Sequence, residues 1–211
     1  EGADVTFNGK VTMPEDHRVT VGKDAVVTFK GGYSASNTGM NGRLLTFGSG
    51  TIVMTNGTFS LPFQIQGQSG NPVNFEFWSA DNNINASRFY NWSSFYGRLT
   101  TKVENAFSLN KTWIQLRGGN AVWDLWGKNQ SVALFHADSG CQVTSAEPAL
   151  LTLTSQNYSE YNDNTGAGGT NCVDQATFTG LVSVKKSGPI PHTFGATSTS
   201  TGTIEVAGGD L

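Results

Sequence analysis

The residues that could perform acid–base or metal chemistry are few in this sequence. The three histidines, His17, His136 and His192, lie far apart, and none stands at metal-ligand spacing from a cysteine or a second histidine. The chain contains no GxSxG, HExxH or Walker motif, and no GxGxxG in a strand-to-helix setting. The sequence therefore gives no support for a serine hydrolase, a zinc protease or a nucleotide-binding enzyme.

Carboxylates are the next source of chemistry, because polysaccharide hydrolases and lyases use acids, or a base with a charge partner, on one face of neighbouring coils. The acidic candidates are Asp81, Glu104, Asp124, Asp138, Glu147, Asp163 and Asp174. They are scattered, and most occupy turn positions where Asp caps its own backbone. We therefore predict that the chain is not an enzyme and has no catalytic residues. A carbohydrate-active lyase or hydrolase remains a third hypothesis.

Oxygen-bearing side chains also gather beside a glycine-rich turn at residues 166–169. They are Glu160, Asn162, Asp163 and Asn164. Such oxygens are typical calcium ligands, but their spacing matches neither an EF-hand nor an RTX nonapeptide. We expect no cofactor and no metal, with calcium at this loop as the alternative.

Aromatic side chains crowd into residues 75–96. Exposed indole and phenol rings can stack on sugars, and neighbouring amides and carboxylates can bond sugar hydroxyls. The candidate ligand-binding residues are Trp78, Asp81, Asn82, Asn83, Arg88, Tyr90, Trp92 and Tyr96. The same rings could instead fill a core or an end cap, so core packing is the competing interpretation of this cluster.

Two cysteines, Cys141 and Cys172, stand about thirty positions apart without a CxxC pair, which argues against a zinc site. We expect them to form one disulfide in an oxidising compartment. That bridge would tie the irregular stretch 156–174 to the strand around Gln142. Two buried free thiols are the alternative.

The overall charge excludes two classes of partner. Charged residues make up 14% of the 211 residues, and the formal net charge is −3. Such a surface has no electrostatic footprint for nucleic acid or for an anionic bilayer. No stretch approaches the roughly 20 apolar residues of a membrane helix, so we expect no membrane insertion of this segment.

Short β-strands must position all of these residues. Apolar and polar side chains alternate over runs such as 4–7, 18–21, 44–47 and 51–54, each bounded by Gly, Asn or Asp. The runs return roughly every eight to eleven residues, and the 26 glycines interrupt every helical pattern. The short strands, glycine-rich corners and few Asn-Gly hairpin signals favour an all-β, right-handed parallel β-helix. A β-sandwich or jelly-roll lectin-like domain is the alternative.

We expect residues 1–211 to form a single β-solenoid domain, or a fragment of a longer one. Insertions are expected at about 71–110 and 156–174, where the strand cadence breaks.

The second half of the chain resembles the autotransporter-associated β-strand repeat family. The run 123–132 (WDLWGKNQSV) is similar to the family pattern LDLNGxNQTV, and 140–153 and 178–211 follow in the family order. The resemblance covers about 123–211, although Pro189 and Pro191 replace the usual GxGTLTL strand. It implies a right-handed β-helix on a bacterial cell surface, often within a longer exported chain, and it brings no catalytic residues.

Three functions follow as expectations. The first is a non-catalytic, extracellular or bacterial cell-surface scaffold or adhesion segment of the passenger type. The second is a carbohydrate-binding lectin or adhesin module that uses residues 75–96, and the third is the lyase or hydrolase. The partners expected are host or environmental glycans or surface proteins, together with self-association through the solenoid ends.

Overall fold

The structure of the chain is a computed structural model. It describes residues 2–13, 17–35, 44–56, 59–60, 63–67, 72–78, 88–91, 97–107, 113–154, 172–189, 191–195 and 198–208. Within these ranges, only the backbone is described for residues 17–18, 35, 44–47, 59–60, 63–67, 88–91, 113 and 172–173. The regular structure of the described residues is entirely β-strand, with no helix.

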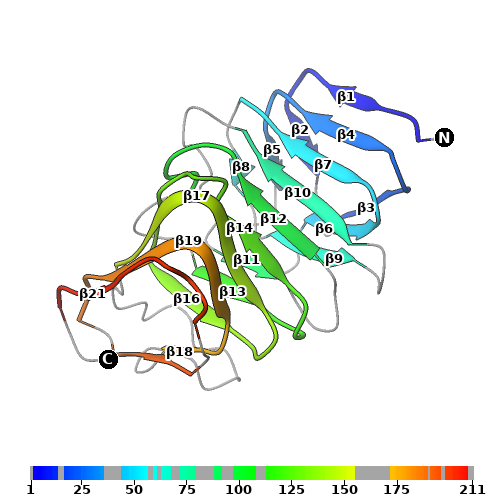
Figure 1. Cartoon of the computed structure of the whole chain (residues 1–211). Helices are drawn as coiled ribbons and strands as arrows, with labels where there is room; N and C mark the ends of the chain where they lie inside the picture. Colours follow the sequence, from blue (N-terminus) through cyan, green and yellow to red (C-terminus); the bar gives the residue numbers. More distant parts are fainter. Residues whose placement is uncertain are drawn as a thin grey trace.

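The described strands stack into three sheets that wind as a right-handed parallel β-helix (Figure 1). Sheet A contains, in spatial order, β1 (Val5–Phe7), β4 (Val26–Phe29), β7 (Thr51–Met54), β10 (Val73–Phe77), β12 (Gly97–Thr101), β14 (Val122–Asp124), β17 (Gln142–Leu153), β19 (Thr177–Lys186) and β21 (Ile204–Val206), with β15 (Gln130–Val132) beside β17. Sheet C contains β3 (His17–Val21), β6 (Leu44–Gly48), β9 (Phe63–Gly67), β11 (Arg88–Asn91), β13 (Trp113–Leu116), β16 (Leu134–Ala137), β18 (Cys172–Asp174) and β20 (His192–Phe194). Sheet B contains β2 (Val11–Met13), β5 (Tyr33–Ala35) and β8 (Phe59–Ser60).

Each strand pairs with strands one coil before or after it. Phe75 pairs with Leu99, and Leu99 pairs with Trp123. Every strand pair in the described part of the chain is parallel, and parallel neighbours cannot be joined by hairpins. The predicted β-helix is therefore confirmed, and the β-sandwich or jelly-roll alternative is excluded.

The alternation in the sequence decides which side chains fill the solenoid. In β10, Val73, Phe75 and Phe77 are fully buried, whereas Asn74 and Glu76 between them face outward and are half-buried. Successive side chains of a strand point to opposite faces, so one face of each strand lines the core and the other meets solvent.

Aromatic rings run through the core from coil to coil. Successive ring centroids lie 5.1 to 6.4 Å apart along the series Phe75, Phe77, Phe107, Trp123, Phe135, Phe178 and Phe194. Trp123 is the largest fully buried side chain, and its indole Nε1 donates to Thr101 Oγ1 at 3.3 Å. Of the aromatic cluster at residues 75–96, Phe75 and Phe77 therefore pack in the core and are not part of a binding surface.

Part of the expected insertion at 71–110, and most of the one at 156–174, lies outside the described residues. Residues 71–110 contribute β10, β11 and β12 to the stacked sheets, but 79–87 and 92–96 are not described. The stretch 156–171 is likewise not described, and β18 begins directly after it. The protruding loops therefore stay predictions.

The predicted disulfide between Cys141 and Cys172 is absent, because Cys141 is a buried free thiol. The Cys141 carbonyl accepts a hydrogen bond from Thr177 N at 2.9 Å, which places it at the corner before sheet A. Cys172 begins β18 in sheet C and pairs with His192. The two cysteines thus lie at different positions around the coil. Burial raises the pKa of the Cys141 thiol, which makes it a poor nucleophile.

Three ionisable side chains are buried in the last coils, namely Asp174, Lys186 and His192. The Lys186 ammonium donates to the carbonyls of Gly188 at 2.7 Å and Gly208 at 2.5 Å. Burial raises the pKa of Asp174 to about 8, although its Oδ1 accepts a hydrogen bond from the backbone N–H of Ala176. Burial lowers the pKa of His192 to about 4, with smaller contributions from Lys186 and His136.

These buried groups predict that stability falls as the pH rises from about 6.5 to about 8. Between pH 3.8 and about 8 the folded protein holds a proton on Asp174 that the unfolded chain releases, so a rising pH favours unfolding. Between about pH 4 and pH 6.5, His192 is neutral in the folded protein and protonated in the unfolded chain, so a rising pH favours folding there. This gain offsets the loss from Asp174 over that range. The free energy of unfolding should drop by about 2 kcal/mol over the upper window.

Denaturant titrations at half-unit pH steps measure this loss, and Asp174→Asn serves as the test variant. Its amide keeps an acceptor for the Ala176 N–H but carries no titrating proton. The decline above pH 6.5 should disappear in the variant. An equal decline in both proteins would show that another group is responsible.

Candidate functional site

Two exposed tryptophans and a lysine form a column on the outer face of sheet A. Phe77 pairs with Thr101, so Trp78, which follows β10, lies level with Lys102. Thr100 pairs with Asp124, so Lys102 lies level with Trp126. The three residues therefore occupy one position in three successive coils, and we call them the indole column. Their line runs along the solenoid axis, across the strands.

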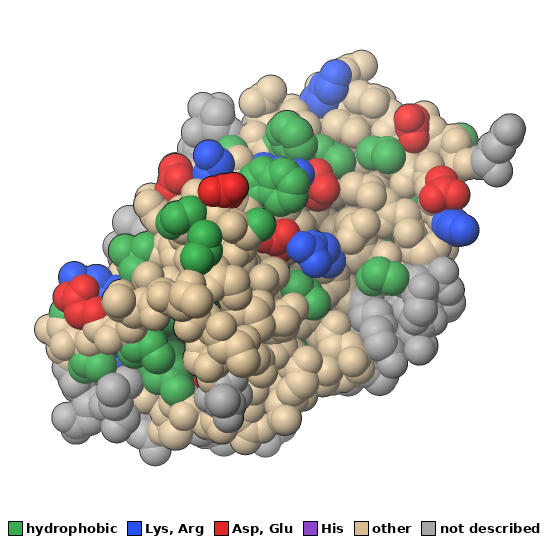
Figure 2. Space-filling view, viewed as in Figure 1, with side chains coloured by type: hydrophobic (Ala, Val, Ile, Leu, Met, Phe, Trp, Pro, Cys, Tyr) green, Lys and Arg blue, Asp and Glu red, His purple; other side chains and the backbone are tan. Residues whose placement is uncertain are grey.

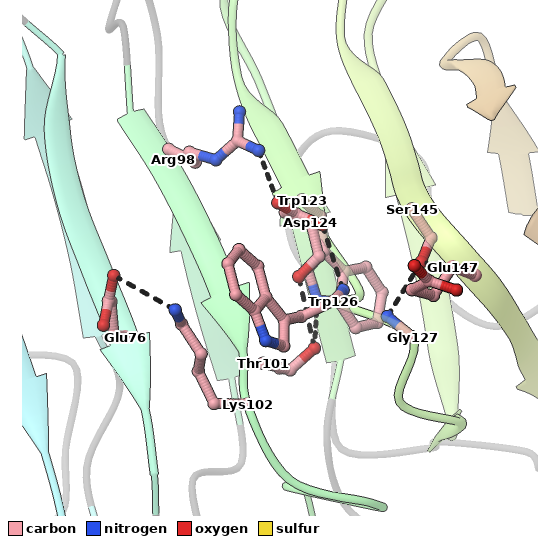
Figure 3. A network of polar contacts seen from close by, with 10 residues as sticks. All are labelled: Glu76, Arg98, Thr101, Lys102, Trp123, Asp124, Trp126, Gly127, Ser145 and Glu147. Atoms are coloured by element: carbon pink, nitrogen blue, oxygen red, sulfur yellow. Dashed lines mark hydrogen bonds and ion pairs between the residues drawn. The ribbon is translucent and has the colours of Figure 1, made fainter. Parts of the chain in front are cut away.

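The Lys102 ammonium lies between the two indoles. It is 5.2 Å from the Trp78 ring centroid and 3.5 Å from the Trp126 ring centroid, both within cation–π range. Glu76 contacts the same ammonium at 3.9 Å and accepts a hydrogen bond from Trp78 Nε1 at 2.8 Å. Figure 3 shows the Trp126 indole leaning back over β12 towards Lys102, with Glu76 on the far side. These contacts favour one orientation of each ring.

Both indoles remain open to solvent. Trp78 is 49% exposed and Trp126 is 52% exposed, whereas the Lys102 side chain between them is only 14% exposed. Figure 2, viewed as Figure 1, shows hydrophobic side chains gathered among acidic and basic ones over the middle of sheet A. The surface of the column thus consists of two half-exposed indoles with a partly buried cation between them.

Trp126 occupies a backbone position that its residue type disfavours. The N–H of Lys128 donates to the Leu125 carbonyl at 2.8 Å, and Trp126 and Gly127 have φ angles of +52° and +67°. These are the features of a type I′ turn, in which Asn-Gly is the favoured central pair. A bulky residue in the left-handed region costs about 1–2 kcal/mol. The turn alone therefore gives no reason for a tryptophan at position 126. Backbone strain of this kind often occurs at functional sites.

Neighbouring coils hold the turn in place. Asp124 Oδ1 accepts a hydrogen bond from Trp126 N at 3.0 Å, while Arg98 donates to Asp124 Oδ2. The N–H of Gly127 donates to Ser145 Oγ at 2.9 Å. A Cβ at Gly127 would lie 2.7 Å from the Cβ of Glu147, so the next coil closes on the turn from its other side. Trp126 is consequently displayed on a rigid support.

Four of the charged side chains around the column form two ion pairs. Lys102 pairs with Glu76, and Arg98 pairs with Asp124. Glu104 is exposed nearby, and its Oε2 accepts a hydrogen bond from Asn129 N at 2.7 Å. The local surface is therefore neutral to slightly acidic.

This arrangement is suited to stacking and hydrogen bonding. The indoles offer apolar faces, and the Arg98 side chain, 42% exposed, keeps donors beyond the one given to Asp124. Among the described residues there is no group of three or more His, Cys, Asp or Glu side chains that could hold a metal ion. The column therefore has the surfaces needed to stack with a sugar ring or an aromatic group, and donors to bond its polar atoms.

The structure separates the ligand-binding residues that the sequence predicted. Trp78 belongs to the indole column beside sheet A, whereas Arg88 and Tyr90 lie on β11 in sheet C. Five further candidates lie outside the described residues: Asp81, Asn82, Asn83, Trp92 and Tyr96. The same holds for the calcium candidates Glu160, Asn162, Asp163 and Asn164.

Sequence reasoning missed Lys102 and Trp126 as partners of Trp78. One available signal was Trp126 itself, because it precedes Gly127 at the position where a tight turn prefers Asn. The other was the equal spacing of residues 78, 102 and 126, which matches the coil length in this region.

Comparisons with models of protein families, with curated proteins and with solved structures found no match to this chain. The resemblance to autotransporter-associated repeats therefore stays an expectation. Nowhere in the described residues is there a helix long and apolar enough to cross a membrane.

Proposed function

We propose that this chain is a non-catalytic adhesion scaffold, a stiff segment of an extracellular or bacterial cell-surface β-helix protein that binds a ligand through the outer face of sheet A. The observation that carries the proposal is the indole column, in which two half-exposed indoles are fixed on three stacked coils. Rings that are already ordered lose little conformational entropy on binding.

The solenoid supports the scaffold half of the proposal. Each coil contacts its neighbours through backbone ladders, and the aromatic series continues through the core from Phe75 to Phe194. A stack of this kind is stiff along its axis and presents its outward side chains at regular intervals.

The engagement of the carboxylates supports binding over catalysis. Glu76 is occupied by Lys102 and Trp78, and Asp124 is occupied by Arg98 and by the Trp126 N–H. A general acid or base must be able to exchange a proton with the substrate, which these paired carboxylates are not placed to do.

The proposal is tested by binding of the purified chain to an array of immobilised glycans and extracellular proteins. The test variant is Trp78→Thr with Trp126→Asn. Thr55 already stands level with Trp78 in the preceding coil, and Asn suits the type I′ turn, so both changes should preserve the fold. The wild-type chain should be retained by at least one surface, and the double variant should lose about tenfold or more of that affinity.

Ile204→Thr is the matched control, because Ile204 is 52% exposed, as Trp126 is, and lies on β21, three strands from β14 in sheet A. It should bind as the wild type does. The proposal is wrong if the wild-type chain binds no surface, or if the double variant binds equally well. Circular dichroism establishes that each variant is folded.

A further inference from the structure

We propose that the ligand of the indole column is an uncharged, extended glycan chain that runs along the solenoid axis and stacks one sugar ring on Trp78 and another on Trp126. This inference rests on the proposed function and specifies the chemical class and the direction of the ligand.

The direction follows from the register of the strands. Trp78 and Trp126 lie two coils apart on a line across the strands. Neighbouring strands are about 4.8 Å apart, so the two tryptophan backbones are separated by about 10 Å. A ligand that touches both rings must therefore extend along the axis. A linear polymer with repeated flat faces satisfies this requirement.

The filled gap between the rings argues against an inserted aromatic ligand. The Lys102 ammonium is 3.5 Å from the Trp126 centroid and lies between the indoles, with its side chain 14% exposed. A planar aromatic group could not slide between the rings without displacing this cation and its pair with Glu76. Ligand units must instead stack on the solvent-facing surfaces of the two rings, one after the other.

The apolar area is too small for a typical protein partner. Across the described residues, the other exposed large hydrophobic side chains lie on β1, β19 and β21, and of these only Leu181 on β19 is level with the turn of Trp126, two strands further along sheet A. Specific protein interfaces bury about 800 Å² on each partner. Two isolated indoles bordered by polar groups fit a narrow chain, since sugars combine apolar faces with hydroxyls that Arg98 and Glu76 can bond.

The charge pairing favours an uncharged sugar. A uronate carboxylate would have to compete with Glu76 for Lys102 or with Asp124 for Arg98, and it would also approach Glu104. The net charge of −3 adds a further repulsion. A neutral glycan meets none of these penalties.

Calorimetric titration with soluble oligosaccharides tests the inference. The neutral probes are β-1,4-linked gluco-, manno- and xylo-oligosaccharides of two to six units, and the acidic probe is hexagalacturonate. At least one neutral series should gain about tenfold or more in affinity between the disaccharide and the hexasaccharide, because only the longer chain engages both rings. Hexagalacturonate should bind about tenfold or more weakly than that hexasaccharide.

The single variants Trp78→Thr and Trp126→Asn give an independent measurement. Each should reduce the affinity for the neutral hexasaccharide to about that of the disaccharide, because one ring remains. Ile204→Thr should leave the affinity unchanged. A fold defect would alter the circular dichroism spectrum and is thereby separated from loss of a ring.

Three outcomes overturn the inference: hexagalacturonate binds as tightly as the neutral chains, affinity does not depend on chain length, or no neutral hexasaccharide binds. If the array at the same time shows column-dependent binding to an acidic glycan or to a protein, the adhesion function stands and only the ligand class is wrong. If neither experiment shows binding, both proposals fail.

Discussion

Replacing Trp123 by alanine should lower the free energy of unfolding by about 3–5 kcal/mol. The side chain is fully buried, and its ring lies 6.0 Å from the rings of both Phe107 and Phe135. Truncation would leave a cavity in the middle of the aromatic series and would remove the bond from Nε1 to Thr101. Urea titration followed by circular dichroism measures the change.

Trp126→Ala is the control, because it removes the same side chain three positions further along. Trp126 is 52% exposed and strained, so its loss should change the free energy of unfolding by no more than about 1 kcal/mol. Equal destabilisation by the two variants would contradict the assignment of Trp123 to the core and of Trp126 to the surface.

Replacing Gly180 by alanine should destabilise the protein by about 3 kcal/mol or more. Gly180 has a φ of +69°, and an added Cβ would lie 2.2 Å from the backbone oxygen of Ser145. Gly180 pairs with Ser145 where the register between β17 and β19 shifts. The backbone of one of these two long strands would have to move, which breaks the ladder on both sides of the shift. Chemical denaturation gives the magnitude.

Gly22→Ala is the matched control for this substitution. An added Cβ at Gly22 meets no atom within 4 Å, so the change in the free energy of unfolding should stay within about 0.5 kcal/mol. If the two alanine variants had the same free energy of unfolding, Gly180 would not lie as close to the Ser145 backbone as the structure places it.

The sequence favoured the correct fold class, with a β-sandwich or jelly roll as the alternative that only the strand pairing excluded. In β10 the order Val73, Asn74, Phe75, Glu76, Phe77 already divides the strand into inward and outward side chains, because the direction alternates at every residue. Short alternating runs with glycine-rich corners, repeated along the chain, favour a stacked solenoid, in which neighbouring coils bury the apolar faces.

The candidate site could be predicted only in part. Trp78 was recognisable as a residue that could bind a ligand, since it stands just after a strand within an aromatic cluster. Its partners were not, because they depend on the coil length between β10, β12 and β14. A shift of one residue in that register would turn Lys102 towards the core and separate the two indoles.

The disulfide prediction was wrong for a related reason. Spacing along the chain says how large a loop a bridge would close, but not where each cysteine lies around the coil. Cys141 lies at the corner before sheet A, and Cys172 lies at the start of β18 in sheet C.

By itself, the sequence determined the all-β character of the chain, the inward residues of strands such as β10 and the net charge of −3, because these depend on local alternation and composition. The tertiary structure alone decided which distant residues meet, including the contact of Trp78 and Trp126 through Lys102. It also placed the exposed Trp126 in a left-handed turn, three residues after the fully buried Trp123.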